Sequence, residues 1–259
     1  MSISAGGHGA ATSPGIVIAV DGPSASGKSS ASRGAARALG LRYLDTGSMY
    51  RALTWWMLAR GIPADDPAVV AQAVGEPSIE VGTDPDGPWV RVDGQDVTAA
   101  VRTQEVTSAV SAVARVPQVR ARLIALQREI IARARAEGRG IVAEGRDIGT
   151  VVAPDAVVKV YLTASERVRA QRRTAESVAS PDVTASTSQH GASQHGPGQV
   201  EATEADQARR DRMDAGQLAR ADDAVEIDST MFGLEDVIGM IAGLAQERAG
   251  LTDTARTTR

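Results

Sequence analysis

The sequence contains no cysteine, and its aromatic residues are limited to three tryptophans, three tyrosines and one phenylalanine. The absence of cysteine excludes disulfide bonds, thiolate nucleophiles and cysteine-based zinc sites. The scarcity of aromatics leaves no platform on which the bases of single-stranded nucleic acid could stack. A formal net charge of −4 also argues against broad binding of a phosphate backbone. We therefore expect no nucleic-acid partner.

Long apolar runs are absent as well. The aliphatic run near the start, Ile16–Val20, is far too short to cross a bilayer. No charged segment followed by an apolar one opens the chain, so we expect no signal peptide. These features predict a soluble, cytoplasmic protein without a membrane partner.

Lysine is rare and asparagine is missing. Of 28 basic residues only Lys28 and Lys159 are lysines. A biased base composition explains most of this pattern, but a lysine kept in such a background points to chemistry that arginine cannot perform. The three histidines, His8, His190 and His195, lie in Gly/Ser-rich stretches, so histidine-based catalysis and metal binding are set aside.

Apolar runs alternate with helical patterns along the chain, which predicts an α/β fold with a parallel sheet. The expected strands are Ile16–Val20, Arg42–Leu44, Ile141–Ala143, Ala156–Leu162 and Ala224–Ile227. The expected helices are Ser29–Leu39, a helix capped by Thr46 that runs to Gly61, Thr103–Val116, Pro117–Ala136 and Leu234–Glu247.

Three stretches interrupt this alternation. Residues 1–14 are small and polar and predict a disordered tail. Residues 63–100 are rich in Asp, Gly and Pro and hold two short strand patterns, Ser78–Val81 and Trp89–Val92, which predict a small antiparallel insertion. Residues 174–203 are of low complexity and predict a flexible loop.

One segment carries a phosphate-binding motif. Residues 22–29 match G-x-x-x-x-G-K-[ST], with an expected strand before them and an expected helix after them. In this motif backbone N–H groups and the N-terminus of the helix surround a polyphosphate. Lys28 would reach the β- and γ-phosphates, and the Ser29 hydroxyl would complete the coordination of Mg²⁺. The expected ATP-binding residues are Gly22, Pro23, Ser24, Ala25, Ser26, Gly27, Lys28, Ser29 and Ser30.

Such a loop occurs in switch GTPases, motor ATPases and small-molecule kinases, and three features separate these classes. The guanine-reading motif Asn-Lys-x-Asp is impossible without asparagine. No apolar strand ends in an Asp-Glu pair that would prepare water for hydrolysis. Arginines recur where a second phosphate-bearing substrate could be clamped, at Arg51, Arg120, Arg146 and Arg210. Together these features favour a kinase.

Five further segments carry a resemblance to a known family. They are residues 20–24 (Val-Asp-Gly-Pro-Ser), 44–51 (Leu-Asp-Thr-Gly-Ser-Met-Tyr-Arg), 101–106 (Val-Arg-Thr-Gln-Glu-Val), 144–152 (Glu-Gly-Arg-Asp-Ile-Gly-Thr-Val-Val) and 221–224 (Ala-Asp-Asp-Ala). In this order they resemble the bacterial cytidylate kinases, which belong to the P-loop nucleoside monophosphate (NMP) kinases. The resemblance spans about residues 16 to 246, apart from the low-complexity loop.

The resemblance implies a three-layer P-loop kinase fold and a monomer that phosphorylates CMP and dCMP with ATP and Mg²⁺. Its NMP-kinase domain would cover residues 15–250, with residues 63–100 as the NMP-binding insertion and about 167–220 as a mobile lid. Residues 251–259 would form a frayed tail.

The resemblance also assigns roles to matching residues. It implies a CMP site formed by Thr46, Tyr50, Arg51, Ser111, Arg120, Glu144, Arg146, Asp147, Arg210 and Asp214. Among these, Ser111 and Arg120 would read the cytosine edge, the turn of residues 144–147 would hold cytosine and the acceptor phosphate, and Arg210 and Asp214 would come from the lid. Lys28, Arg146, Asp147 and Arg210 are the expected catalytic residues.

Two positions depart from the family pattern. Glu144 stands where the family has mainly Asp, and Gln217 stands where the pattern carries an arginine. Arg220 lies one helical turn after Gln217 and either replaces that arginine or lies on a solvated surface.

Two other functions remain open at the level of sequence. One is another P-loop kinase that acts on UMP, AMP or a metabolite. The other is a nucleotide-binding module whose altered lid no longer supports turnover.

Overall fold

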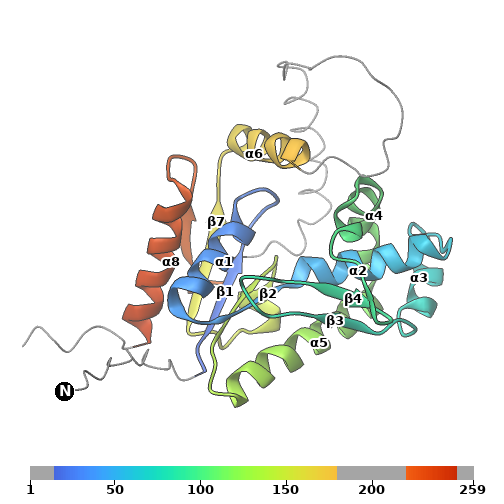
Figure 1. The fold of residues 1–259 in the computed structure, drawn as a ribbon, viewed down its shortest axis with the longest axis horizontal. Coiled ribbons are helices and arrows are strands. Elements are labelled where there is room, and N and C mark those ends of the chain that lie inside the picture. Colours follow the sequence, from blue (N-terminus) through green and yellow to red (C-terminus); the bar gives the residue numbers. More distant parts are fainter. Residues whose placement is uncertain (1–14, 180–219, 250–259) are drawn as a thin grey trace, which may run out of the picture.

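A five-stranded parallel sheet forms the centre of the protein (Figure 1). The computed structural model describes residues 15–179 and 220–249. The strands are β1 (Val17–Asp21), β2 (Arg42–Asp45), β6 (Ile141–Glu144), β7 (Val158–Thr163) and β8 (Val225–Asp228), in the spatial order β2-β6-β1-β7-β8. Every neighbouring pair is parallel. The predicted α/β class with a parallel sheet is confirmed.

Helices cover both faces of this sheet, because the strands are apolar on both sides. On one face, alternate residues such as Ile18 and Val20 pack against α1 (Lys28–Leu39) and α8 (Leu234–Arg248). On the other face, residues such as Val17 and Ala19 pack against α2 (Thr46–Ala59) and α5 (Pro117–Ala136). The three-layer arrangement follows directly from this two-sided burial.

The insertion is an antiparallel sheet of β3 (Ile79–Val81), β4 (Val90–Val92) and β5 (Gln95–Asp96), preceded by α3 (Pro67–Ala73). The two predicted strands are present, whereas β5 and α3 were not predicted. Asp93 and Gly94, both with positive φ, form the tight turn between β4 and β5. The carboxylate of Asp66 caps α3 by accepting hydrogen bonds from two backbone N–H groups.

The remaining elements are η1 (Ala100–Arg102), α4 (Gln104–Ala114), the π-helical turn η2 (Ile148–Val152) and α6 (Glu166–Ala179). Because α6 extends to Ala179, the first six residues of the expected loop 174–203 are helical. The rest of that loop, residues 180–203, and both expected tails lie outside the described residues. Within the described ranges, no helix is both long and apolar enough to span a membrane.

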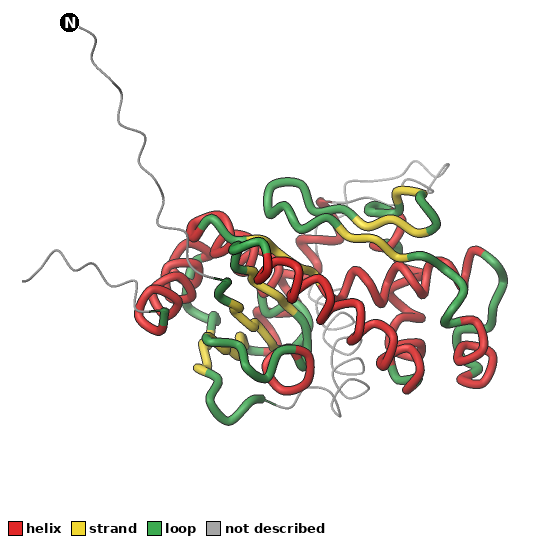
Figure 2. The backbone as a smooth tube through the Cα atoms, turned by 90° about the horizontal axis from the view of Figure 1, so that it is seen from below, coloured by secondary structure: helices red, strands yellow, loops and turns green. Residues whose placement is uncertain are grey.

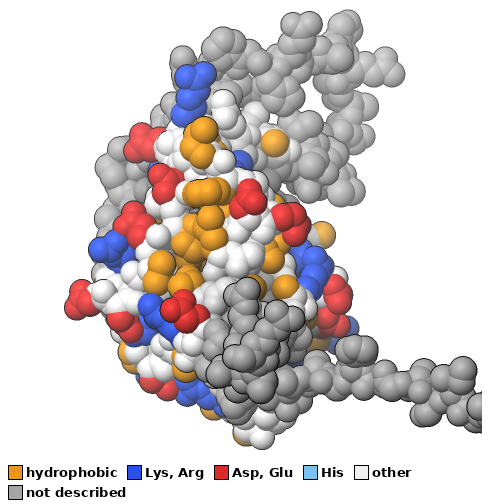
Figure 3. All heavy atoms as spheres, turned by 90° about the vertical axis from the view of Figure 1, so that its left-hand side faces the viewer, with side chains coloured by type: hydrophobic (Ala, Val, Ile, Leu, Met, Phe, Trp, Pro, Cys, Tyr) orange, Lys and Arg blue, Asp and Glu red, His pale blue; other side chains and the backbone are white. Residues whose placement is uncertain are grey.

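The face on the α8 side carries hydrophobic side chains among charges of both signs (Figure 3). Acidic and basic side chains alternate there and do not gather into a patch of one sign. The exposed apolar residues Met231 and Phe232 precede α8, and Leu234 opens it. This face therefore lacks the basic stripe expected of a nucleic-acid-binding surface.

Gly22 provides a stability test of the turn after β1. Its φ is 146°, and a Cβ atom there would lie 2.0 Å from the carbonyl oxygen of Leu162. We expect Gly22→Ala to lower the free energy of unfolding by about 2 kcal/mol or more in urea titrations. Gly40→Ala is the control, because Gly40 has φ 65° with open space around it and should cost only about 1 kcal/mol. Equal losses at both positions would contradict the close approach.

Candidate active site

The carboxyl ends of three adjacent strands bring the candidate residues together. Val20 of β1 and Asp45 of β2 are both in register with Glu144 of β6, which lies between them. Open parallel sheets bind their ligands at this edge. A cavity of about 600 Å³ opens there. Its walls are formed by the phosphate loop, the start of α2, the hairpin of β3 and β4, η1, the turn after β6, and Arg173 of α6.

The phosphate loop has the backbone geometry that its motif requires. Gly27 has φ 91° and caps α1, and Ala25 has φ 58°, a conformation that a residue with a side chain seldom adopts. The Lys28 side chain folds back over the loop, where its Nζ donates to the Pro23 carbonyl at 2.7 Å and lies 3.4 Å from Ser26 Oγ. Only 6% of Lys28 is exposed. The predicted lysine is therefore held within the loop.

Two arginines of α6 hold the outer carbonyls of this loop. Arg169 Nη1 donates to the Ser24 carbonyl at 3.2 Å, and Arg172 Nη1 donates to the Ser26 carbonyl at 3.1 Å. Arg172 also donates to Ser229 Oγ at 2.9 Å. Ala25, with its strained backbone, lies between Ser24 and Ser26 in the sequence. Helix α6 therefore holds the loop on both sides of the strained residue. Sequence analysis missed these residues, although the cluster of arginines at the start of α6 was a signal.

Asp21 connects the phosphate loop to the turn after β6. Its two carboxylate oxygens accept hydrogen bonds from the N–H groups of Ile148 and Gly149, each at 2.8 Å. Burial raises the pKa of the Asp21 carboxyl, while these two hydrogen bonds lower it. On the same turn, Arg146 Nη1 donates to the Gly22 carbonyl at 3.1 Å. Arg146 therefore lies beside the phosphate loop.

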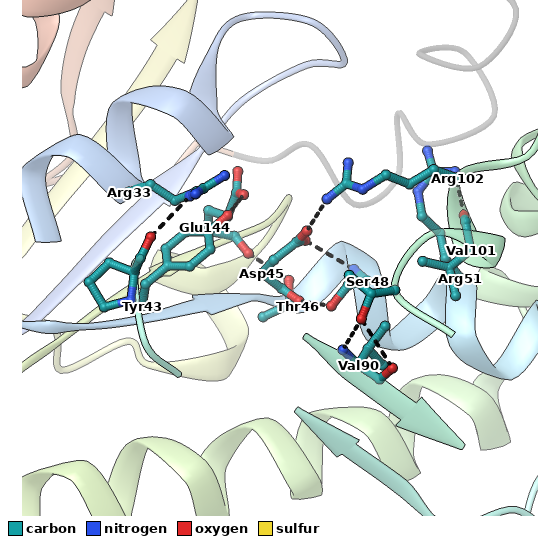
Figure 4. A network of polar contacts seen from close by, with 12 residues as sticks. Arg33, Tyr43, Asp45, Thr46, Ser48, Arg51, Val90, Val101, Arg102 and Glu144 are labelled. Carbon is teal, nitrogen blue, oxygen red and sulfur yellow. Dashed lines mark hydrogen bonds and ion pairs between the residues drawn. The ribbon is translucent and has the colours of Figure 1, made fainter. Parts of the chain in front are cut away.

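Glu144 points toward the phosphate loop and is almost completely buried. The Tyr43 hydroxyl donates to its Oε1 at 2.5 Å. Burial raises the pKa of Glu144 to about 7, and the neighbouring charge of Asp45 adds to this effect. Lys28 and a hydrogen bond from Ser29 oppose the rise. In Figure 4 the carboxylates of Glu144 and Asp45 lie between arginines on either side of the site.

A second group lies beside the cavity, around η2 and α5. Arg120 of α5 forms an ion pair and hydrogen bond with Asp147. Burial raises the pKa of the nearby Tyr50 to about 12, an effect that Arg120 opposes. Ser111 is buried on α4, which packs against α5. The carboxylate paired with Arg120 is thus Asp147, while Glu144 belongs to the phosphate-loop group.

Thr46 does not cap α2 as predicted. It is the first residue of α2, and the cap is Asp45, whose carboxylate accepts from the Ser48 N–H at 3.0 Å. The predicted Thr46 cap is therefore wrong, because Asp45 occupies the cap position with an extended backbone. The buried Thr46 hydroxyl instead donates to the Glu144 carbonyl at 2.7 Å, which ties α2 to β6.

Two arginines face the cavity from the side of the insertion. Arg51 Nη1 donates to Thr107 Oγ1 at 2.9 Å, and Arg102 lies 3.7 Å from the carboxylate of Asp45 (Figure 4). Arg102 was not predicted as a site residue. The predicted residues Arg210 and Asp214, and also Gln217, lie outside the described residues. Arg220 is described and forms an ion pair with Glu226, which favours the surface interpretation.

Comparison with known proteins identifies the family. The family model for cytidylate kinase matches residues 18–247. The chain belongs to the cytidylate kinase family. A cytidylate kinase of Streptomyces coelicolor is 50% identical over 249 residues, which cover 94% of this chain and 99% of the relative.

Other relatives in the cytidylate kinase family agree. One from Streptomyces avermitilis is 47% identical over 93% of this chain and 97% of its own length. One from Rhodococcus opacus is 46% identical over 91% of this chain and 97% of its own length. The resemblance found in the motifs is confirmed, and the P-loop kinase fold agrees with it.

The buried Glu144 predicts a pH dependence of stability. An acid whose pKa is higher in the folded than in the unfolded chain makes the folded state bind more protons. The free energy of unfolding should therefore fall as the pH rises from about 4.5 to about 7. Glu144→Gln removes this term, so its stability relative to the parent protein should be greater at pH 8 than at pH 5, by up to about 3 kcal/mol.

Urea unfolding at both pH values measures this difference. Glu129→Gln is the control, because Glu129 is exposed on α5. The same stability difference for Glu144→Gln at the two pH values would show that Glu144 titrates as an ordinary exposed acid.

Proposed function

We propose that this protein transfers the γ-phosphoryl group of ATP to CMP and dCMP, a reaction of pyrimidine nucleotide metabolism in the cytoplasm. The observation that carries the proposal is a single cavity at the sheet edge, with the phosphate loop on one side and Arg51, Arg102 and Arg146 on the others. This geometry suits two phosphate-bearing substrates that meet end to end. Family membership supports the same reaction.

The phosphate loop is the donor side. Lys28 now donates to a neutral backbone carbonyl and lies close to a hydroxyl. Phosphate oxygens carry charge and form stronger hydrogen bonds with an ammonium group than neutral acceptors do. Lys28 can therefore exchange these partners for the β- and γ-phosphates of ATP and stabilise the charge on the transferring group.

The loop also fits a magnesium ion carried with ATP. The Ser29 hydroxyl forms a hydrogen bond with the buried Glu144 carboxylate at the loop. Within residues 15–179 and 220–249, no group of three or more acidic or histidine side chains could hold a metal alone. Mg²⁺ commonly binds through few protein ligands together with substrate phosphates and water. When bound it supplies positive charge to the phosphate oxygens, with Ser29 as the protein ligand and Glu144 behind it.

The acceptor side needs positive charge more than it needs a base. The attacking oxygen of CMP belongs to a phosphate and is already anionic, so in-line transfer requires positioning and charge neutralisation. Arg51 and Arg146 lie on the cavity wall for this purpose. The pair of Arg120 and Asp147, with Ser111 on the adjacent helix, is suited to the cytosine edge, which offers an amino donor beside N3 and O2 acceptors.

A panel of acceptors tests this assignment. With Mg·ATP, we expect CMP and dCMP to be phosphorylated well, and UMP, AMP and GMP poorly, in a coupled assay of ADP release. Asp147→Asn should lower the ratio of kcat/KM for CMP to that for UMP by about 10-fold, because an amide accepts more weakly than a carboxylate from the cytosine amino group and its NH2 can instead donate to O4 of uracil. Glu144→Gln is the matched comparison and should leave that ratio unchanged. Equal turnover of CMP and UMP by the parent protein would reject the cytosine assignment.

Lys28→Ala tests catalysis itself. We expect kcat to fall by at least ~100-fold, because the ammonium group stabilises charge in the transition state. The melting temperature should remain close to that of the parent protein, since Lys28 packs no apolar core. If the parent protein binds ATP and CMP but releases ADP no faster than Lys28→Ala, the protein is a nucleotide-binding module and the kinase assignment fails.

A further inference from the structure

The loop between β3 and β4, residues 82–89, crosses from the insertion to α1 of the central domain. Figures 1 and 2 both show it extending toward that helix. Arg37 Nε of α1 forms an ion pair with Asp86 Oδ1 at 2.7 Å. Arg37 Nη2 and Arg33 Nε both donate to the Pro85 carbonyl, at 3.1 and 3.3 Å. We call these three contacts the brace.

The loop is also fixed at its base and within itself. The Thr83 carbonyl accepts from the Tyr43 N–H of β2 at 2.9 Å, and Thr83 Oγ1 accepts from Arg42 at 2.8 Å. The Asp86 N–H donates to Asp84 Oδ1 at 2.9 Å, which shapes the tip of the loop. Because Thr83 anchors the base of the loop to β2, the brace determines where the tip of the loop lies.

The same loop is a wall of the candidate active site. Gly82, Asp86, Gly87 and Pro88 line the cavity, and so does Arg33. Arg37 does not belong to the lining, since it lies in the last turn of α1, away from Lys28 at the first turn. Helix α1 therefore carries the phosphate-loop lysine at one end and the anchor of the opposite wall at the other.

The exposure of the Arg37–Asp86 pair suggests a purpose other than stability. The two side chains are 46% and 77% exposed, and an ion pair of this kind contributes little to the stability of a fold. Its two members are 49 residues apart in the sequence and connect helix α1 to the loop between β3 and β4. Such a contact can set the position of the β3–β4 loop relative to α1.

We propose that Arg37 is a positioning residue for the acceptor nucleotide: through Asp86 and Pro85 it holds the hairpin wall in place without touching the substrate. This proposal rests on the proposed function, because that function places CMP against the hairpin wall. Losing the brace should then weaken the binding of CMP more than that of ATP, whose site lies on the phosphate loop.

Charge reversal and its rescue test the proposal. Arg37→Asp places two carboxylates together and should raise KM for CMP by about 5-fold, while kcat and KM for ATP stay within about twofold. Asp86→Arg alone should have a similar effect. The double variant Arg37→Asp/Asp86→Arg restores an opposite-charge pair and should return KM for CMP to within about twofold of the parent value.

The chain offers a closely matched control. Arg135 lies in the last turn of α5 and pairs with Asp155 at 2.7 Å, with side chains 37% and 65% exposed. Neither residue lines the cavity. Arg135→Asp should therefore leave every kinetic constant unchanged. An equal effect of Arg135→Asp and Arg37→Asp would overturn the proposal, as would a normal KM for CMP in Arg37→Asp.

Hydrogen–deuterium exchange separates this proposal from the proposed function. Without nucleotide, Arg37→Asp should increase exchange in residues 82–89 relative to the parent protein, and the double variant should reverse the increase. If the parent protein fails to phosphorylate CMP, the proposed function fails, and the exchange data alone decide whether the brace holds the loop. Unchanged exchange in Arg37→Asp would overturn the brace in either case.

Discussion

Asp21 is the constraint on which both halves of the candidate site depend. It is the last residue of β1, and its carboxylate accepts the N–H groups of Ile148 and Gly149. Those N–H groups belong to the turn that follows Arg146 and Asp147, so two hydrogen bonds fix this turn against the strand that leads into the phosphate loop. The carboxylate is costly to bury, and the paired N–H groups compensate part of that cost. Together with the hydrogen bond from the Gly145 N–H to the Val20 carbonyl, Asp21 thus holds the turn where its arginine meets the phosphate loop.

Within this frame several cations of the site donate hydrogen bonds to neutral oxygens. Lys28 and Arg146 donate to neutral carbonyls of the phosphate loop, and Arg51 donates to a hydroxyl. Charged phosphate oxygens are stronger acceptors than any of these. Arg120 is paired with Asp147 beside the cavity, and on the cavity wall Arg102 lies 3.7 Å from the carboxylate of Asp45. The arrangement suits a cavity that accepts anionic substrates, because phosphate oxygens can replace these neutral acceptors.

Local signals in the sequence predicted most of the fold. The phosphate loop, the five strands and the bounds of α5 followed from apolar runs, glycines and a proline at the start of a helix. The elements that were missed depend on single residues: Asp66 caps α3, and Asp93 with Gly94 turns β4 into β5. The placement of Glu144 and Asp147 could not be predicted, because they are only three residues apart in sequence. Glu144 ends β6 near the phosphate loop, whereas the bend of residues 145–147 directs Asp147 toward α5.

The second lysine, Lys159, shows how the same frame extends to β7. The sequence suggested that a lysine kept in this chain serves chemistry, but Lys159 forms an ion pair within the fold: its Nζ lies 2.9 Å from the Asp223 carboxylate, and its side chain is only 9% exposed. The aliphatic part of the Lys159 side chain lies beside Gly149, whose N–H group donates to Asp21. Asp223 lies just before β8, and α6 contacts the phosphate loop through Arg172. The phosphate loop and the turn after β6 are thus each held by a cation of a neighbouring element, Arg172 for the loop and Lys159 for the turn, so the support of the candidate site extends to α6 and β7.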